Sequence, residues 1–326
     1  MKAYVVNKNE NGDFVSGIEE VPIPVIGEDE VLIKASYSSL NFKDALSSIG
    51  NPGVTRTFPH ITGIDVAGVV ESSNSDNFEV GEPVLVTGYD LGMNTDGGHS
   101  EFVKVPASWI VKMAEGLSDK ESMIYGTAGL TAALSVQELL SNDVTPEQGE
   151  VLVTGATGGV GSVAVAILSK LGFDVVALSG KEEKIPFLKS IGAKEVILRD
   201  AFDVENKKPM LKPRFSAVID TVGGNILAHA LKVTKYDGVV TCCGLNASHE
   251  LSITVFPFIL RGVRLIGIDS VEMALGKKEA AWNKIANEFK IPELETLCTE
   301  IGLEEIKTAY ETLLSGKSVG RYLVKI

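Results

Sequence analysis

A glycine-rich turn near the middle of the chain is the pattern best suited to binding a ligand. Residues 151–161 read Val-Leu-Val-Thr-Gly-Ala-Thr-Gly-Gly-Val-Gly, an apolar strand that passes through a turn into a helix. Glycines in this context let the backbone approach a pyrophosphate, whose charge is stabilised by the helix N-terminus. The pattern predicts a dinucleotide site on Gly155, Gly158, Gly159 and Gly161. The alternative is a tight strand-to-helix connection with no ligand.

The end of the next strand indicates which dinucleotide binds. An NAD site usually carries Asp or Glu about 20 residues beyond the glycines, where it bonds the ribose 2′-hydroxyl. Here the strand ends in Ser179, and Lys181 and Lys184 follow. A hydroxyl and two cations suit a 2′-phosphate, so we predict NADPH. An ordinary solvated helix start rich in charge is the alternative.

The same turn also fits short-chain dehydrogenases, which need a Tyr-x-x-x-Lys pair downstream of the loop as proton donor. Of the seven tyrosines, only Tyr4 has a lysine four residues later, Lys8, and that pair precedes the loop. The short-chain interpretation is therefore excluded.

The amino-acid composition indicates which classes of binding partner the protein can have. The 326 residues carry a formal charge of −13, which disfavours binding to nucleic acid phosphates or anionic lipid. No apolar run reaches 18 residues, and the polar residues at 7–10 leave no room for a signal peptide. Three cysteines cannot build a disulfide framework. We expect a cytoplasmic protein with a small-molecule substrate.

The elements that must position the site fall into two kinds. Residues 1–110 hold short alternating segments separated by Gly, Pro, Asn and Asp, typical of a partly open β-barrel. Ser118 with Glu121 three positions later marks a helix start. From residue 150 six short apolar strands alternate with helices, which predicts an α/β, doubly wound parallel Rossmann sheet. A helix is predicted at 278–288 and a final strand at 321–326.

This arrangement resembles the medium-chain dehydrogenase/reductase superfamily, and within it the YhdH/YhfP group of quinone oxidoreductase-like and acryloyl-CoA reductase proteins. The resemblance covers the whole chain and lies in seven blocks: residues 39–46, 63–68, 125–129, 153–162, 219–224, 257–263 and 267–270, with the ending 320–325. It implies a Rossmann domain at 121–268 inserted into a GroES-like barrel domain formed by 1–120 and 269–326.

Zinc dehydrogenases of this superfamily bind the catalytic metal with an early Cys and the His of a Gly-His-Glu block. The corresponding places here hold Asn41 and Gly63-Ile64-Asp65, and no cysteine lies at 85–105 where a structural zinc would need thiolates. The four histidines, among them His99, show no ligand spacing. We predict that no metal binds and that His99 is a turn residue.

The resemblance places residues 41–44 beside the nicotinamide in an interdomain cleft. Asn41 is then a donor to the substrate carbonyl, and Lys43 or Asp44 orients the substrate or relays a proton. Many relatives have Tyr where this chain has Phe42, so solvent is a plausible proton source. The alternative for Lys43 and Asp44 is an ion pair at a helix start.

The resemblance also implies the cofactor contacts, region by region. They are Phe42 and Thr127 at the nicotinamide; Gly158, Gly159, Val160, Gly161 and Ser162 at the pyrophosphate; Ser179, Lys181, Lys184 and Arg199 at the adenosine phosphate; and Gly244, Leu245, Phe258, Ile259, Ser270 and Arg321 along the far wall. For Arg321 the alternative is surface charge. Cys242 and Cys243 end a strand and are interpreted as small buried hydrophobes.

The apolar segment Val263 to Ile268 forms the last Rossmann strand, and an edge strand of this kind can pair with its own copy. We therefore expect a homodimer through this edge.

The activity expected is hydride transfer from NADPH to a conjugated double bond, most simply that of acryloyl-CoA or a similar short enoyl thioester. Quinone reduction in the same site is the first alternative, and a non-catalytic NADPH-binding redox sensor, favoured by the loss of Tyr at Phe42, is the second. Lys207, Lys208, Lys212 and Arg214 could bind CoA phosphates, although a solvated loop explains them equally well.

Overall fold

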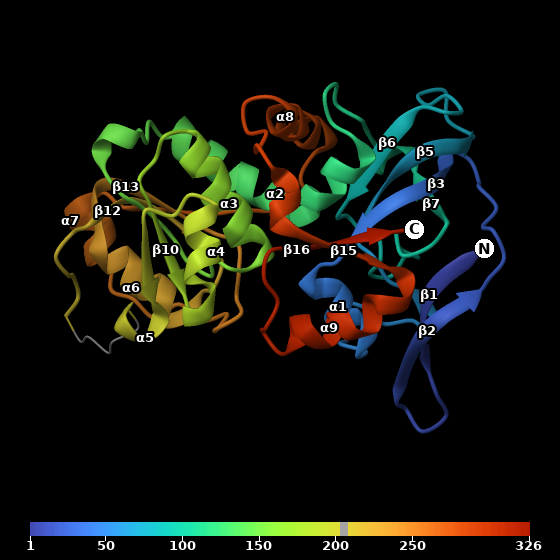
Figure 1. The fold of residues 1–326 in the computed structure, drawn as a ribbon, viewed down its shortest axis with the longest axis horizontal. Coiled ribbons are helices and arrows are strands. Elements are labelled where there is room, and N and C mark those ends of the chain that lie inside the picture. The colour runs from blue at the N-terminus through green and yellow to red at the C-terminus, as the bar shows by residue number, and fades with distance from the viewer. Residues whose placement is uncertain (203–207) are drawn as a thin grey trace. The chain divides into compact units, whose positions relative to one another are not determined.

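The computed structural model describes residues 1–202 and 208–326, and these divide into two compact units. Unit 1 comprises residues 1–128, 270–287 and 293–326, and unit 2 comprises residues 129–269 and 288–292. In chain order, unit 2 is therefore inserted into unit 1. Both termini belong to unit 1 (Figure 1).

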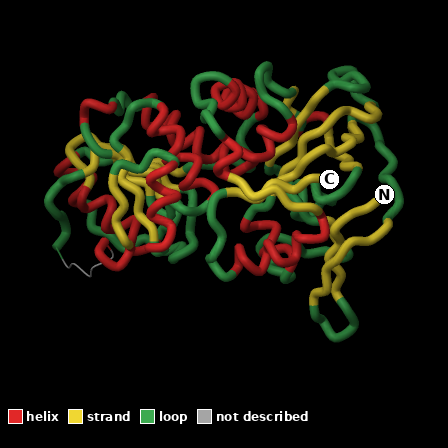
Figure 2. Tube along the Cα trace, in the orientation of Figure 1, coloured by secondary structure: helices red, strands yellow, loops and turns green. Residues whose placement is uncertain are grey.

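Unit 2 is built on a six-stranded parallel sheet in the order β11-β10-β9-β12-β13-β14. Its strands are β9 Val151–Val153, β10 Val175–Ser179, β11 Glu195–Leu198, β12 Phe215–Asp220, β13 Thr234–Cys242 and β14 Arg264–Gly267. Its helices are α3 Gly159–Lys170, α4 Ile185–Ser190, α5 Arg199–Phe202, α6 Gly224–Val233 and α7 Phe256–Arg261. Figure 2 shows the strands side by side among helices.

All six strands that the sequence predicts are present, and the direction of strand succession reverses between β9 and β12. Parallel strands that are covered on both faces consist of continuous apolar residues, so the sequence alone indicates where these strands lie. Leu152, Val176, Val218 and Val240 form the centre of the core. The reversal point is where open α/β sheets bind their ligands.

Unit 1 holds a seven-stranded sheet, β15-β16-β3-β5-β6-β8 with β7 on β3, and a three-stranded sheet, β2-β1-β4. The strands are β1 Lys2–Lys8, β2 Phe14–Glu20, β3 Glu30–Ser39, β4 His60–Ile61, β5 Asp65–Ser73, β6 Pro83–Thr87, β7 Phe102–Pro106, β8 Val111–Lys112, β15 Cys298–Gly302 and β16 Arg321–Lys325. The helices are α1 Phe42–Ser48, α8 Leu275–Ala286 and α9 Ile306–Leu314. Helix α2, Asp119–Ser141, contains the unit boundary.

Short 3₁₀ turns complete the structure at Ala107–Trp109, Pro146–Gln148, Glu182–Lys184, Leu294–Leu297 and Leu303–Glu305. The start of α2 is as predicted: Ser118 Oγ donates to Glu121 Oε2 at 2.9 Å, and Glu121 N donates back to Ser118 Oγ at 3.2 Å. The α/β fold class with a Rossmann sheet and a β-rich domain is confirmed. Among the described residues, no helix is long and apolar enough to cross a membrane.

Candidate active site

The glycine turn of unit 2 has a backbone that other residues cannot adopt without strain. Gly155 has φ +56°, and a Cβ there would lie 2.4 Å from Thr221 Oγ1. A Cβ on Gly161 would lie 2.4 Å from the Gly155 carbonyl oxygen, so this glycine lets α3 pack against the turn. A Cβ on Gly158 would meet only the Gly155 oxygen within 4 Å, at 3.3 Å. The turn therefore leaves room for a pyrophosphate at the start of α3, and its residues fit a dinucleotide.

Side-chain hydrogen bonds join the ends of β9 and β12, the two neighbouring strands between which the strand order reverses. Thr154 Oγ1, after β9, donates to Asp220 Oδ1 at 2.7 Å, and Thr221 N donates to Thr154 Oγ1 at 3.0 Å. Asp220 also accepts from Gly223 N at 2.8 Å. Burial raises the pKa of the Asp220 carboxyl. Sequence reasoning did not assign Asp220 a role, although its position at the end of β12 could have indicated one.

The predicted adenosine phosphate residues come together at the carboxyl ends of β10 and β11. Ser179 pairs with Leu198 across these strands, which brings Arg199 beside Gly180. A Cβ on Gly180 would lie 3.2 Å from Arg199 Cζ, so the guanidinium rests against this glycine. Lys181 N donates to Ser179 Oγ at 3.0 Å, and burial lowers the pKa of the Lys181 ammonium, with a smaller contribution from Lys184.

The other predicted unit 2 contacts divide into two groups. A Cβ on Gly244 would lie 1.9 Å from the Thr221 carbonyl oxygen, so Gly244 lies against the residue that follows β12. Leu245, the next residue, is exposed. Phe258 packs against the core of unit 2, whereas Ile259 is exposed. Gly244 and Gly155 of the glycine turn therefore both border Thr221, and no such contact is found for Ile259.

Cys243 donates to the Asp220 carbonyl oxygen at 3.5 Å. Burial, with a smaller contribution from Asp220, raises the pKa of its thiol to about 12. The pKa of Cys242 is raised by the same causes. Neither thiol is activated. Both residues were expected to be buried small hydrophobes, but the structure leaves them only partly buried.

In unit 1 a buried carboxylate, Asp65, gathers four hydrogen bonds. Its Oδ2 accepts from Ser39 Oγ at 2.6 Å, Asn41 Nδ2 at 2.7 Å and Thr127 N at 2.8 Å, and its Oδ1 accepts from Thr127 Oγ1 at 2.5 Å. The side chain has no exposed surface. The sequence indicated Asp65 only as part of the Gly63-Ile64-Asp65 block, one residue after the zinc-ligand position, so its place at the centre of this cluster was not predicted.

The predicted catalytic segment lies next to Asp65, at the start of α1. Asn41 is the N-cap residue and is 8% exposed, so its amide reaches the surface only narrowly. Asp44 is fully buried and accepts from Asn41 N at 2.7 Å and from Ile64 N at 2.9 Å. Burial and then the neighbouring Asp65 charge raise the pKa of Asp44 to about 7. Among the described ion pairs none joins Lys43 to Asp44, so the structure does not support the alternative that these two residues form an ion pair at the start of the helix.

Helix α2 is broken beside the same carboxylate. Gly126 has φ 52° and ψ −161°, outside the helical region. A Cβ on Gly126 would lie 2.4 Å from Ser39 Oγ, 2.6 Å from Asp65 Oδ2 and 2.8 Å from Arg321 Nη2. Arg321 is 4% exposed, so the alternative that it is surface charge is wrong.

The cluster does not fit a catalytic zinc. Asparagine ligates a metal through its amide oxygen, and Asn41 Oδ1 accepts a hydrogen bond from the Arg321 guanidinium at 3.4 Å, a cation that would repel a metal ion. The Asp65 oxygens are occupied by four donors. Within residues 1–202 and 208–326, no group of three His, Cys, Asp or Glu side chains could hold a metal ion.

His99 lies in a bend, as predicted, but it is fully buried in a hydrogen-bonded group. Its Nδ1 is 2.9 Å from Thr62 Oγ1 and 3.1 Å from the Tyr310 hydroxyl, and Tyr310 donates to Thr62 at 2.8 Å. Burial lowers the pKa of His99 to about 3. The imidazole is therefore neutral at physiological pH.

This burial predicts a loss of stability in acid. In the unfolded chain His99 gains a proton below its ordinary pKa of 6.5, whereas the folded protein resists protonation down to about 3, so stability falls as pH decreases from 6.5 to 3. The loss amounts to roughly 4 kcal/mol at pH 3. Comparing urea midpoints of the wild type and His99→Gln between pH 7 and 3.5 isolates this effect. Parallel pH profiles for the two proteins would contradict it.

Ser270, the remaining predicted cofactor residue, is buried in the return segment of unit 1. A Cβ on Gly88 would lie 3.3 Å from the Ser270 carbonyl oxygen, so this segment packs on the end of β6. The buried Lys278 of α8 secures the contact, because Nζ donates to the Thr87 oxygen at 2.6 Å and to the Val271 oxygen at 2.9 Å.

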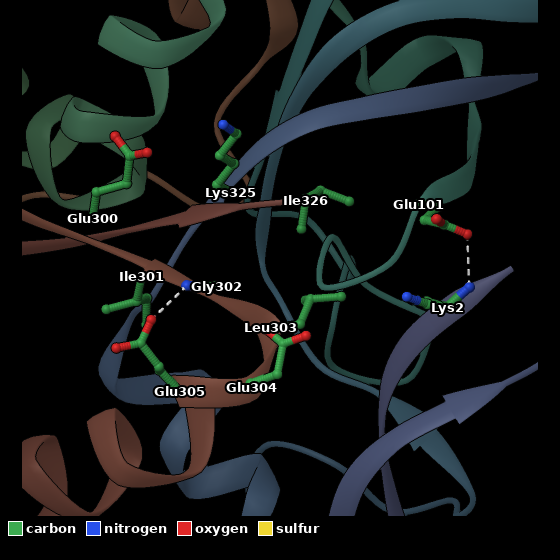
Figure 3. Close-up of a pocket in the computed structure, with 10 residues that line it drawn as sticks. All are labelled: Lys2, Glu101, Glu300, Ile301, Gly302, Leu303, Glu304, Glu305, Lys325 and Ile326. Atoms are coloured by element: carbon green, nitrogen blue, oxygen red, sulfur yellow. Dashed lines mark hydrogen bonds between the residues drawn. The ribbon is translucent and has the colours of Figure 1, made fainter.

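Two surface hollows lie away from these clusters. One, of about 450 Å³, is lined by charged and apolar residues of unit 1: Lys2, Glu101, Glu300, Ile301, Gly302, Leu303, Glu304, Glu305, Lys325 and Ile326. Figure 3 shows that Glu101 and Glu305 turn to backbone nitrogens, of Lys2 and Gly302 respectively. Both carboxylates therefore already accept hydrogen bonds from the backbone of unit 1.

The second hollow, of about 540 Å³, lies in unit 2 and includes Lys212 and Arg214 of the predicted basic cluster. Arg214 is already paired, with Glu150 at 2.9 Å and Glu195 at 2.6 Å. Lys207 lies outside the described residues. The basic cluster therefore offers less free charge than the sequence indicates.

Comparison with known proteins agrees with this geometry. A family model described as "Alcohol dehydrogenase GroES-like domain" matches residues 27–115, and one described as "Zinc-binding dehydrogenase" matches residues 159–287. The second description names a metal for which the residues around Asn41 and Asp65 are not suited.

Similar proteins cover nearly the full chain. "Putative quinone oxidoreductase YhfP" of Bacillus subtilis is 44% identical over 97% of this chain and 96% of its own. "Probable acrylyl-CoA reductase AcuI" of Escherichia coli is 40% identical over all of both chains.

Solved structures match equally well. The yhdH oxidoreductase of Salmonella enterica in complex with NADP has a TM-score of 0.95 at 40% identity, with all of both chains covered. Bacillus subtilis yhfP with NAD bound has a TM-score of 0.95 at 42% identity, covering 100% of this chain and 99% of that one. The chain thus belongs to the medium-chain dehydrogenase/reductase superfamily, in the group that contains YhdH, YhfP and AcuI.

Proposed function

We propose that this protein is an NADPH-dependent, zinc-independent oxidoreductase that reduces the activated double bond of acryloyl-CoA or a similar short enoyl thioester. The observation that carries the proposal is the Asn41 amide, held by Asp65 where metal-dependent relatives have zinc ligands. The names of the relatives AcuI and YhfP support an oxidoreductase, and the NADP in the yhdH complex supports the cofactor.

Bound NADPH supplies the hydride. The chain's own residues then have to stabilise the negative charge that develops on the thioester carbonyl. Asn41 Nδ2 uses one hydrogen for Asp65, and the described residues show no second hydrogen bond from this nitrogen. We assign that second hydrogen to the substrate oxygen. Because Phe42 has no hydroxyl, the proton on the α-carbon comes from solvent.

Asp44 acts behind Asn41 rather than on the substrate. Its carboxyl is fully buried and holds the backbone nitrogens of Asn41 and Ile64. It therefore fixes the first turn of α1 and the start of β5, the two places from which Asn41 and Asp65 project. Lys43, which is only half-buried, is the better candidate for a direct contact with the substrate.

Quinone reduction is the second candidate. The name of the relative YhfP favours it, and so does the pairing of Arg214 with two glutamates, which removes a cation from the predicted CoA phosphate contacts. A quinone needs no such cations.

The test is NADPH consumption at 340 nm with acryloyl-CoA and, in parallel, with benzoquinone, each repeated with NADH. Turnover of acryloyl-CoA with NADPH supports the enoyl reductase. Turnover of benzoquinone alone would move the activity to quinone reduction. Tight NADPH binding with no turnover of either acceptor would contradict the mechanism assigned to Asn41 and favour a redox sensor.

Cofactor preference provides a separate prediction. Replacing Ser179 with Asp places a carboxylate where the 2′-phosphate is expected, so the KM for NADPH should rise roughly 100-fold while that for NADH changes little. Arg199→Ala should raise the KM for NADPH roughly 10-fold. Steady-state kinetics with both cofactors measure the effect.

Lys194→Ala is the matched control, because Lys194 precedes β11 whereas Arg199 follows it, and it pairs with Asp174. It should leave both KM values unchanged. Equal losses with NADPH and NADH in Ser179→Asp would show that Ser179 does not face a 2′-phosphate.

We also propose that the protein is a cytoplasmic homodimer formed through the edge strand β14. Exposed apolar side chains of α7 lie next to it in sequence, with Ile259 67% and Leu260 53% exposed. Light scattering after size exclusion should show a dimer that Ile259→Glu dissociates. Val80→Glu, at an exposed apolar position of unit 1, is the control. A monomeric wild type would contradict the proposal.

A further inference from the structure

Arg321, the first residue of β16, is a buried cation whose contacts lie next to the proposed active site. Its Nη1 donates to the Leu40 carbonyl oxygen at 3.1 Å and to Asn41 Oδ1 at 3.4 Å. Leu40 N in turn donates to the Tyr322 oxygen at 3.1 Å. The start of β16 therefore holds both backbone groups of Leu40 and the side-chain oxygen of Asn41.

The same guanidinium lies at the break in α2. Its Nε donates to the Ile124 carbonyl oxygen at 3.1 Å, at the end of the first half of the helix. Beyond Gly126, the Asp65 carboxylate accepts from Thr127 N, the first residue of the second half. A cation thus lies at a helix C-terminus and an anion at the following N-terminus, the favourable arrangement for both helix dipoles.

The positive charge of Arg321 lies near the carboxyl groups of Asp65 and Asp44. Burial lowers the pKa of Arg321 below its ordinary value, and the charges of the fully buried Asp65 and Asp44 oppose this shift. Arg321 Nη2 is buried without a hydrogen-bond partner, and both this nitrogen and Asp65 Oδ2 border Gly126. The guanidinium is therefore held by hydrogen bonds from both Nε and Nη1, a fork that lysine cannot reproduce.

These contacts decide which way the Asn41 amide faces. Arg321 can only donate, so it selects the oxygen of the amide, and Asp65 in its charged form can only accept, so it selects the nitrogen. We infer that Arg321 is a positioning residue, which together with Asp65 fixes the orientation of the Asn41 amide so that its second N–H faces the substrate. This rests on the proposed function, and it differs from the cofactor contact that the sequence predicts for Arg321.

Kinetics of Arg321→Lys test the inference. We expect kcat with acryloyl-CoA to fall about 10-fold or more, because a small misplacement of a donor is costly, while the Kd of NADPH, measured by its fluorescence enhancement, stays within about 2-fold. A Kd weakened about 10-fold with kcat retained at saturating NADPH would make Arg321 a cofactor contact. Unchanged kcat and Kd would also overturn the inference.

A double-mutant cycle tests the route through Asn41. In an Asn41→Ala background, Arg321→Lys should lower kcat less than about 2-fold further, because the amide it orients is gone. A full additional 10-fold loss would show that Arg321 acts elsewhere. Thermal unfolding of all four proteins verifies that each is folded at the assay temperature.

Hydrogen exchange of the Asn41 side-chain amide tests this inference without any catalytic turnover, and so separately from the proposed function. In protein labelled with ¹⁵N-asparagine, the Asn41 side-chain signal is assigned by its absence in Asn41→Ala. Its exchange with D₂O should be at least about 10-fold faster in Arg321→Lys than in the wild type, because the amide loses its fixed orientation. If the wild type reduces neither acceptor, the proposed function fails, and this exchange rate still decides the positioning role. Equal rates would refute it.

Discussion

Replacing Gly126 with alanine is expected to be the most damaging small change in unit 1. The residue has φ 52° and ψ −161°, a region that is essentially accessible only to glycine. The new methyl group would also lie within 2.8 Å of Ser39 Oγ, Asp65 Oδ2 and Arg321 Nη2. Strain and displacement of this buried cluster together should cost roughly 4 kcal/mol.

We therefore expect Gly126→Ala to lower the urea midpoint clearly and to reduce kcat by at least about 100-fold. Gly276→Ala is the matched control. Gly276 lies in the first turn of α8, has no atom within 4 Å of an added Cβ, and should tolerate alanine or gain slightly from it. A Gly126→Ala protein with the stability and kcat of the wild type would show that α2 is not broken at this residue.

Removing the Asp65 carboxylate should have a similarly large effect. In Asp65→Ala the donors on Ser39, Asn41 and Thr127 lose their shared acceptor, and Arg321 loses a neighbouring anion. Leaving buried donors and a buried cation uncompensated costs roughly 3 kcal/mol or more. Because Asn41 is no longer held, kcat should fall about 1,000-fold.

Asp65→Asn separates charge from hydrogen bonding. The amide oxygen can accept the three bonds now made to Oδ2, and its nitrogen can donate to Thr127 Oγ1, so the protein should fold. The Asp65 charge contributes to the raised pKa of Asp44, so that pKa should move down from about 7 in this variant.

Carboxyl ¹³C NMR of Asp44 as a function of pH measures the shift. The control is Asp76→Asn, which neutralises an exposed aspartate and should leave Asp44 and kcat unchanged. An Asp44 that titrates identically in Asp65→Asn and the wild type would exclude the coupling between the two buried carboxyls.

Most of the Rossmann unit could be predicted from the sequence alone. Its central strands β9, β10 and β12 are short, fully buried and mostly apolar runs, and the glycine turn lies directly between β9 and α3. These signals are local: residues adjacent in sequence specify the strand, the turn and the helix start. The same holds for the Ser118–Glu121 cap, and for Ser179 and Lys181 at the end of β10.

Only the tertiary structure identified the centre of the unit 1 cluster. Asp65, Thr127 and Arg321 lie up to 256 residues apart in the printed numbering, and no periodicity connects them. The sequence located Asn41 and Asp44 by resemblance, but it gave Arg321 a place along the cofactor and Asp65 none. Burial and hydrogen-bond partners depend on how β5, α2 and β16 pack together, so the role of a buried charge is decided by residues distant in the chain.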